Sequence, residues 1–289
     1  MELIRRLHLM REAVRKARAE GKKIAFVPTM GALHDGHLAL VRRARELGDI
    51  VVVSIFVNPE QFGPDEDYDT YPRDLARDTD LCVEEHVDFI FAPDPKEMYP
   101  DGFRTYVEVE GLSSILEGAS RPGFFRGVCT AVLKLLSVVN PHFAFFGQKD
   151  MQQAVIVQTM VRDLNLNVEI VLCPTVRDDD GVALSSRNVR LNVSERVSAM
   201  ALRRALERGR VLIEDQGVSS VEEVETKVRD VLGADESIKI DYFAVVDPVS
   251  LERPETIGGE VLLLLAVWIG QTRLIDNISA CPEPPDEAE

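Results

Sequence analysis

Short apolar segments alternate with amphipathic segments through the first part of the chain. The apolar segments are rich in Val, Ile and Phe and have the length of buried strands; they span residues 24–27, 50–57, 87–92, 143–146 and 168–172. The amphipathic segments place apolar residues at helical spacing and span residues 73–86, 127–139 and 150–165. Strands that alternate with helices predict a doubly wound α/β fold, in which helices cover both faces of a parallel sheet.

After Pro174 this alternation stops. Two long amphipathic segments and then three strand-like segments follow, at residues 194–215, 219–232, 238–246, 261–268 and 272–278. Helices followed by neighbouring strands are typical of an α+β domain. Ser194, with Glu195 beside it, is the expected start of the first of these helices, and Gly217 is its expected end.

These patterns predict two domains and a tail. A larger α/β domain covers residues 1–175, and a smaller α+β domain covers residues 176–280. Residues 281–289 are rich in proline and acid and bury too little apolar area to offset the entropy of ordering. We therefore expect a disordered acidic tail.

Composition and charge exclude several classes of protein. With 289 residues, 45% of them hydrophobic, the chain can bury a large core. Its 33 Lys and Arg residues against 49 Asp and Glu residues give a net charge of −16, which argues against a broad surface for nucleic acid or anionic membrane. An anionic substrate would therefore need a local positive pocket.

Nothing in the sequence indicates export or membrane insertion. Residues 1–20 mix apolar positions with many charges, which predicts an amphipathic helix and no signal peptide. The longest apolar run, residues 261–269, is shorter than the roughly 20 residues of a membrane-spanning helix. The four cysteines form no CxxC pair and no metal-ligand spacing, so we expect neither zinc nor disulfides and place the protein in a reducing cytoplasm.

The most informative segment is IAFVPTMGALHDGHLALV, where an apolar run ends in a Gly-containing turn before an amphipathic segment. It predicts a strand, a loop and a helix start, with His34 and His37 at the junction. A helix N-terminus offers unpaired N–H groups and a partial positive charge, which bind phosphate, and two nearby imidazoles add donors. The alternative is that the histidines only cap the helix; for the pair we favour phosphate binding.

Two further polar loops follow predicted strands. Ligands of a doubly wound sheet lie beyond the carboxyl ends of its strands, so these loops should converge with the first. Gln61 offers an uncharged amide that can orient a hydroxyl or a carboxylate. Lys149 could meet phosphate, while Asp150 either caps the following helix or accepts from a ribose hydroxyl. Of Gln152 and Gln153, at most one should face the site, because adjacent helical residues point about 100° apart.

The segment SSRN provides two hydroxyls and a guanidinium, from Ser185, Ser186 and Arg187, on a loop with Gly181 as its expected hinge. A solvated linker is the alternative interpretation of so short a motif. Together with the histidines and Lys149, the segment completes a ring of neutral and cationic donors. No nucleophilic Ser/His/Asp order, GxSxG turn or P-loop occurs, so the pattern indicates transfer at phosphorus without a protein nucleophile.

Five motifs connect the chain with a known family: PTMGALHDGH, FVNPEQFG, FGQKDMQQ, DGVALSSRN and TRLIDNI. In this order and spacing, residues 24–278 resemble the pantothenate synthetase (pantoate–β-alanine ligase) family of the nucleotidylyltransferase superfamily. The HIGH-type element of that superfamily corresponds to residues 34–37, and its KMSKS-type loop to residues 185–187. The resemblance implies a Rossmann-like N-terminal domain, a smaller C-terminal domain that closes the site, and a homodimer.

The same resemblance implies ATP-dependent amide synthesis in two steps, with Mg²⁺. The carboxylate of pantoate attacks the α-phosphorus of ATP and releases pyrophosphate; the amine of β-alanine then attacks the carbonyl of pantoyl adenylate and releases AMP. Adenylylation is needed because a carboxylate is a poor acceptor for an amine until its oxygen belongs to a good leaving group. Catalysis would consist mainly of positioning and of charge neutralisation.

The resemblance also assigns residues to these tasks. The phosphate contacts fall to His34, His37, Lys149, Ser185, Ser186 and Arg187. The nucleotide is further bound by Pro28, Thr29, Met30, Val176 and, at the ribose, Gly147 and Asp150. Pantoate is held by Gln61, Gln153 and the backbone N–H of Met30, and Mg²⁺ by Asp78.

Two positions depart from the pattern of the family. Arg77 stands where an acid often precedes Asp78, which bears on the metal site. Phe124, in RPGFFRGV, stands where the family commonly has histidine, so a donor for β-alanine or phosphate is missing. The other motifs are intact, and we expect activity to be retained.

Two other functions stay open at this stage. A nucleotidylyltransferase with a phosphorylated acceptor would need an added Arg or Lys in the loops that carry Gln61 and Gln153. A regulatory nucleotide-binding protein without chemistry is disfavoured by the intact His34, His37 and Lys149, but only turnover excludes it.

Overall fold

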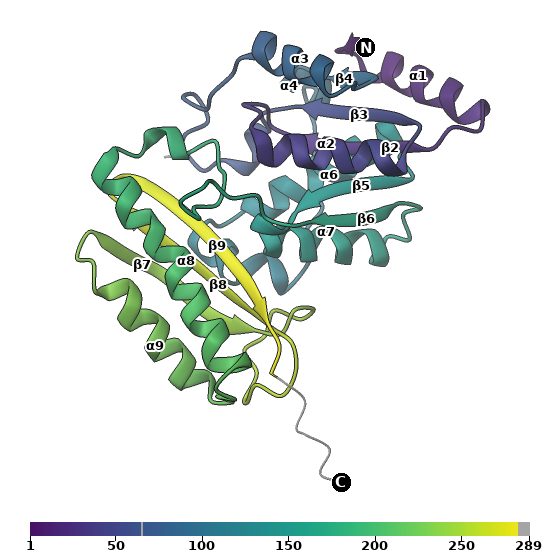
Figure 1. The fold of residues 1–289 in the computed structure, drawn as a ribbon. Helices are drawn as coiled ribbons and strands as arrows, with labels where there is room; N and C mark the ends of the chain where they lie inside the picture. The colour runs from purple at the N-terminus through teal and green to yellow at the C-terminus, as the bar shows by residue number, and fades with distance from the viewer. Residues whose placement is uncertain (65, 283–289) are drawn as a thin grey trace. The chain divides into compact units, whose positions relative to one another are not determined.

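The chain forms two compact units, which divide between Val176 and Arg177, one residue from the predicted boundary. The structure is a computed structural model that describes residues 1–64 and 66–282 (Figure 1). Of the predicted tail, residues 281–289, the structure describes only residues 281 and 282. The rest of that prediction lies outside the described residues.

The first unit is built on a six-stranded parallel sheet. In sheet order the strands are β1 (Glu2–Ile4), β4 (Phe89–Phe91), β3 (Ile50–Ile55), β2 (Ile24–Thr29), β5 (Phe143–Gly147) and β6 (Glu169–Cys173). Because β2 lies between β3 and β5, the strand order reverses there, and the loops after β2 and β5 leave the same edge of the sheet. Doubly wound sheets bind their ligands at such a reversal.

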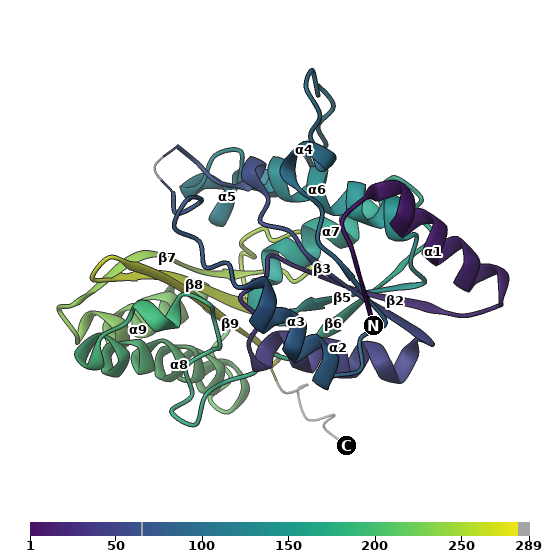
Figure 2. The same cartoon turned by 90° about the horizontal axis from the view of Figure 1, so that it is seen from above.

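Helices cover both faces of this sheet. They are α1 (Leu7–Ala19), α2 (Asp35–Leu47), α3 (Leu75–Glu84), α4 (Pro95–Met98), α5 (Glu117–Ser120), α6 (Phe124–Val139) and α7 (Met151–Asp163), with the 3-10 turns η1 (Pro59–Gln61), η2 (Leu112–Ser114) and η3 (Gln148–Asp150). Figure 2 shows α2 and α3 on one side of the strands and α6 and α7 on the other. The predicted doubly wound α/β fold is confirmed.

The alternation of side chains along β2 explains the two layers. Ile24 and Phe26 point into the core that α1, α6 and α7 cover. Ala25 and Val27 point into the core that α2 and α3 cover. All four side chains are fully buried, because successive residues of a strand face opposite sides of the sheet and both sides are covered here.

The second unit is an antiparallel sheet with two helices packed against it. It consists of η4 (Asn188–Arg190), α8 (Val193–Glu214), α9 (Val221–Gly233), β7 (Ile238–Val246), β8 (Val261–Ile269) and β9 (Thr272–Ala280). The strands lie in sequence order, with β8 in the centre, and one core of apolar residues joins the helices to the sheet. The predicted α+β architecture is therefore present.

Two details differ from the sequence-based expectations. The predicted N-terminal helix begins only at Leu7, and the residues before it add β1 to the edge of the sheet. The expected start of α8 at Ser194 is wrong: Asn192 is the N-cap, and it exchanges hydrogen bonds with Glu195. In the described part of the chain, no helix combines the length and the apolar character that a membrane crossing requires.

Candidate active site

The loop after β2 is held in one conformation by hydrogen bonds. Gly31 and Ala32 both have positive φ angles, of 83° and 50°, which is unusual for alanine. The hydroxyl of Thr29 accepts from the Gly31 N–H at 3.1 Å and donates to the Ser54 carbonyl at 2.6 Å. The two carboxylate oxygens of Asp78 accept from the N–H groups of Ala32 and Leu33, at 2.9 and 2.8 Å. These hydrogen bonds therefore fix the orientation of the residues that follow the loop.

Those next residues are His34 and His37, which lie side by side at the start of α2. Their ring centroids are 4.1 Å apart, and the His34 N–H donates to Nδ1 of His37 at 3.4 Å. His34 occupies the N-cap position, so the expected capping role and a role in binding are compatible. Nδ1 of His34 is buried and has no hydrogen-bond partner among the described residues. A buried polar atom of this kind is available to hydrogen-bond a ligand.

Both imidazoles are held in the neutral form. Burial lowers the pKa of His37 to about 3, with smaller contributions from His34 and Lys149. Burial also lowers the pKa of His34, followed by the positive charge of Lys149. Since Nδ1 of neutral His37 accepts a hydrogen bond, its proton is on Nε2, which is then a donor.

Lys149 lies close to this pair. It follows β5, the neighbour of β2, and its charge contributes to the pKa shifts of both histidines. Its ammonium group is 3.7 Å from the Asp150 carboxylate. Asp150 occupies the N-cap of α7 but makes no capping hydrogen bond with its side chain, so the capping role is wrong. The structure thus brings together His34, His37 and Lys149, the three donor groups that the first unit was predicted to contribute to phosphate binding.

Gln61 is brought to the loop after β2 from η1. Its side-chain N–H donates to the Met30 sulfur at 2.8 Å. Its amide oxygen accepts from Nδ2 of Asn58 at 3.1 Å, and Asn58 itself is buried. Asn58 also donates to the Gly127 carbonyl at 3.0 Å and accepts from the Tyr99 hydroxyl at 2.8 Å. The Gln61 amide is consequently fixed in orientation.

Asn58 is a residue that sequence reasoning missed. Its one signal is its position between an apolar run and a proline in FVNPEQFG, which is typical of the start of a turn. The structure gives it that task as well, since its side chain accepts from the Glu60 N–H. Its further role in orienting Gln61 depends on partners far along the chain.

The two glutamines that begin α7 have different environments. Gln152 is buried, and its amide bonds the carbonyls of Leu112 and Ile115 and the N–H of Glu117. It therefore fixes the segment around η2. Gln153 is half-buried on another side of the helix. Its predicted contact with substrate stays a prediction.

Pro28, Thr29 and Gly147 lie at the carboxyl ends of β2 and β5, on the edge that carries the histidines and Lys149. Val176 is the last residue of the first unit. The remaining predicted residues, Ser185, Ser186 and Arg187, belong to the second unit.

The segment 185–187 forms a compact loop within the second unit. The Ser185 hydroxyl accepts from the Arg187 N–H at 3.3 Å, and the Ser185 carbonyl accepts from the Asn188 N–H at 3.0 Å. Gly181, the expected hinge, has a φ of 86° in a turn closed by its N–H bond to the Asp178 carbonyl. A turn bonded in this way argues against a hinge at Gly181.

The predicted metal ligand Asp78 has another task in the structure. Both of its oxygens are engaged by the loop after β2, and its side chain is buried, which raises its pKa. Across residues 1–64 and 66–282, no three His, Cys, Asp or Glu side chains are grouped so that they could hold a metal ion. A role for Asp78 in binding Mg²⁺ stays a prediction, and its role in the loop is what the contacts support.

The comparisons with known proteins agree with this geometry. The family model for pantoate-beta-alanine ligase matches residues 2–279. The chain belongs to the pantoate–β-alanine ligase family. Curated relatives named pantothenate synthetase include those of Caldicellulosiruptor saccharolyticus, 51% identical over 96% of this chain and 99% of the relative, and Moorella thermoacetica, 52% identical over 96% and 98%. The resemblance drawn from the five motifs is confirmed.

Solved structures of this ligase family share the fold. Pantothenate synthetase from Thermus thermophilus superposes with a TM-score of 0.91 at 46% identity, covering 96% of this chain and 99% of its own. The pantoate-beta-alanine ligase from Francisella tularensis, complexed with beta-gamma ATP and beta-alanine, has a TM-score of 0.79 at 35% identity and covers 96% and 97%. Those two ligands are ligands of the Francisella protein.

The two departures from the ligase pattern both have structural partners. Arg77 donates to the Leu33 carbonyl at 3.1 Å and so helps Asp78 to hold the loop before His34. The Phe124 ring lies under the guanidinium of Arg121, 3.7 Å from ring centroid to Cζ. Arg121 in turn pairs with Glu66 through two bonds of 2.6 Å and donates to the Gln61 carbonyl at 3.3 Å. Phe124 therefore supports the Gln61 loop instead of supplying a donor.

Proposed function

We propose that the protein joins pantoate and β-alanine to give pantothenate, with ATP as the second substrate of the first step. The pantoate carboxylate attacks the α-phosphorus of ATP, which forms an acyl adenylate and releases pyrophosphate. The β-alanine amine then attacks the acyl carbonyl, forms the amide and releases AMP. The observation that carries the proposal is the convergence of His34, His37 and Lys149 beside the Met30–Gln61 contact, in a chain that belongs to this ligase family.

The phosphate end of the site consists of neutral and cationic donors. Nε2 of His37 carries a proton that can be donated to a phosphate oxygen, and Lys149 supplies positive charge. Pro28, Thr29, Gly147 and Asp150 are assigned to the nucleotide on the same edge of the sheet. The charge that develops on departing pyrophosphate is stabilised by groups that are already in place, which is the main contribution that such a site makes to rate.

The acid end of the site is neutral. The Gln61 amide, fixed by Asn58, can hold the pantoate hydroxyl and carboxylate, with Gln153 and the Met30 N–H as further partners. A phosphorylated acceptor would call for an added cation, but Arg121, the guanidinium that reaches the Gln61 loop, is already paired with Glu66. These contacts favour pantoate over a phosphorylated acceptor.

The remaining assignments complete the proposal. Val176 would contact the nucleotide, and Ser185, Ser186 and Arg187, which belong to the C-terminal unit, would bind its phosphates and so close the site. Mg²⁺ would neutralise charge on the triphosphate; a cation held mainly by substrate phosphates needs few protein ligands, of which Asp78 is the candidate. We further propose a cytoplasmic homodimer.

The test is pantoate-dependent exchange of labelled pyrophosphate into ATP by the pure protein, which isolates the first step. We expect exchange with pantoate and Mg²⁺, and pantothenate by mass spectrometry only when β-alanine is added. Lys149→Ala should lower the exchange rate on the order of a hundredfold, because charge stabilisation of the departing group is lost. No exchange by the wild-type protein would refute the proposal.

A matched control separates loss of chemistry from loss of structure. Lys96 lies on the short helix α4, and Lys96→Ala removes one exposed ammonium group as well. We expect this variant to keep wild-type exchange. Circular dichroism of both variants checks that the fold is unchanged.

A further inference from the structure

The motif TRLIDNI near the end of the chain contains a buried carboxylate with a specific partner. Asp276, on β9, accepts from Nη1 and Nη2 of Arg177 at 2.7 and 2.9 Å. The side chain of Asp276 is 3% exposed and that of Arg177 is 18% exposed. A buried bidentate pair of this kind fixes geometry as well as distance. Nothing in the proposed function gives Asp276 a task.

Arg177 also closes the small hairpin at which the second unit begins. Its Nη1 donates to the Gly181 carbonyl at 3.1 Å, and its backbone pairs with that of Ala183. The Asp178 N–H donates to the Val182 carbonyl at 2.9 Å. Val182 and Ala183 are each only 6% exposed. The Arg177 guanidinium therefore joins the hairpin to strand β9.

The hairpin leads directly into the segment 185–187. The side-chain amide of Asn188 donates to the Ala183 carbonyl at 3.0 Å, which ties the far end of the segment back to the hairpin. The bonds within the segment, from Arg187 and Asn188 to Ser185, leave it little freedom of its own. Its position within the second unit is thus set by the position of Ala183.

A second contact supports the other side of the hairpin. Arg196, on α8, donates to the Asp180 carboxylate at 2.7 and 2.8 Å and to Asp178 at 2.5 Å. These carboxylates are more exposed than Asp276, at 28% and 41%. The hairpin is therefore attached to the rest of the second unit in two ways. The Arg177–Asp276 ion pair is the buried attachment, and the ion pairs of Arg196 are the more exposed one.

We propose that Asp276 is a positioning residue for ATP, which acts through Arg177 and the hairpin to hold Ser185, Ser186 and Arg187 in their binding geometry. The proposal rests on the proposed function, because it takes the ligand of that segment to be a triphosphate. A buried ion pair is weak evidence of stability, since its desolvation offsets much of its attraction. What the proposal uses is its geometry, because two parallel hydrogen bonds fix the orientation of Arg177 relative to β9. A positioning role also accounts for a buried carboxylate 99 residues from its partner along the chain.

The test compares Asp276→Asn with a control that removes one carboxylate from the same unit. Asparagine keeps the shape but cannot accept from both Arg177 nitrogens. We expect the KM and the Kd for ATP to rise roughly 10- to 100-fold while the KM for pantoate stays unchanged, because a displacement of a binding segment acts only on its own ligand. Amide exchange of residues 178–188 should become faster.

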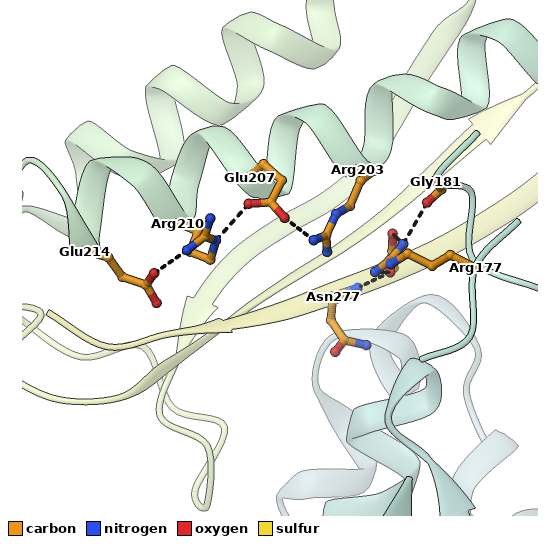
Figure 3. Close-up of polar contacts among 8 residues, drawn as sticks. Arg177, Gly181, Arg203, Glu207, Arg210, Glu214 and Asn277 are labelled. Atoms are coloured by element: carbon orange, nitrogen blue, oxygen red, sulfur yellow. Dashed lines mark hydrogen bonds and ion pairs between the residues drawn. The ribbon is translucent and has the colours of Figure 1, made fainter. Parts of the chain in front are cut away.

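The control is Glu207→Gln. Glu207 pairs with Arg203 and Arg210, and Arg210 pairs with Glu214, so these ion pairs join residues of α8 to one another (Figure 3). This variant should leave the ATP and pantoate constants and the exchange of residues 178–188 at their wild-type values. If Asp276→Asn does not fold, Arg177→Lys is used instead, because it keeps the charge and loses the two-pronged contact.

Two readouts separate this proposal from the proposed function. Calorimetric titration measures the Kd for ATP directly, whether or not the protein forms an adenylate. A folded Asp276→Asn or Arg177→Lys variant whose ATP affinity stays within about twofold of wild type overturns the positioning role. Failure of wild-type pyrophosphate exchange overturns the proposed function and leaves the affinity comparison to decide on Asp276.

Discussion

At the scale of single residues, burial decides the charge of the groups that would meet phosphate. His37 is kept neutral because burial disfavours a positive charge on its ring and because His34 and Lys149 add to that cost. A neutral imidazole still donates from Nε2, whereas its protonated form would lose the hydrogen bond from the His34 N–H. In the proposed site, Lys149 would therefore supply positive charge and His37 a directed hydrogen-bond donor.

The pKa of His37 makes the stability of the protein depend on pH. The group binds its proton at about pH 3 when folded and near 6.5 when unfolded, so between these values the unfolded chain binds more protons. Stability from neutral His37 is fully present above about pH 6.5 and is lost as the pH falls toward 3. When the pH is lowered from about 7 to about 5, we expect the free energy of unfolding to fall by about 2 kcal/mol more in the wild type than in His37→Asn. Urea unfolding at both pH values measures this difference.

The control for this measurement is His8→Asn. His8 is exposed on α1, so its replacement should leave the pH dependence like that of the wild type. Parallel pH dependence in the wild type and His37→Asn would contradict the expectation.

At the scale of elements, the close approach of α6 to η1 positions Gln61. A Cβ atom on Gly127 would lie 2.0 Å from the Glu60 carbonyl oxygen and 2.7 Å from the Gln61 nitrogen, so the two backbones touch only because this residue is glycine. The Gly127 carbonyl also accepts from Asn58, which orients the Gln61 amide. Helix packing and the orientation of the Gln61 amide therefore depend on the same contact.

Gly127→Ala should push η1 away from α6. We expect a destabilisation of about 1 to 3 kcal/mol from overpacking and a KM for pantoate that is raised roughly tenfold, with the KM for ATP changed less. Thermal unfolding and steady-state kinetics measure the two effects. Gly63→Ala is the matched control in the same loop, since its Cβ would make only ordinary contacts with Glu66, at 3.6 Å and beyond. Equal pantoate constants for wild type and Gly127→Ala would show that η1 does not move.

At the scale of the whole molecule, the chain contains separate hydrophobic cores. Two of them, on the two faces of the parallel sheet, contain only residues of the first unit, and the third contains only residues of the second. A domain with its own core can in principle fold alone. The division at Val176 also separates the predicted phosphate-binding residues into two groups, with Ser185, Ser186 and Arg187 in the second unit.

A fragment of residues 1–176 should therefore fold without the rest of the chain. We expect a cooperative thermal transition and dispersed amide signals in nuclear magnetic resonance, because both cores of the sheet are complete in it. It should give no pyrophosphate exchange, because it lacks the 185–187 segment. A fragment without a cooperative transition would mean that the first unit needs the second to fold.

The type and order of the elements could be predicted from local pattern. β7 was predicted with its observed limits, and α8 within one residue at each end, because long periodic segments leave few alternatives. β1 was missed because its three residues continue the apolar spacing of the helix that follows, and only pairing with β4 makes them a strand. Asn192 and Ser194 are both good N-caps, and the backbone path chose between them.

The identity of the chemistry was also readable in the sequence, since imidazole, ammonium and amide groups follow the ends of buried strands in recognisable motifs. The sequence does not show which residues these groups contact through hydrogen bonds and ion pairs. Asp78 binds the loop before His34 across 45 residues, and Arg177 binds Asp276 across 99. Such contacts depend on where the chain returns to itself, and that is set by the packing of whole elements.

The sequence alone therefore determined the alternation of strands and helices, the family and the kinds of side chain at the site, because these depend on periodicity and on neighbours along the chain. The tertiary structure decided that His37 is neutral, that Gln61 is oriented by Asn58, that Phe124 supports Arg121, and that a buried carboxylate in β9 is joined to the first hairpin of the second unit. Each of these depends on burial or on a contact between residues that only folding brings within a few ångströms.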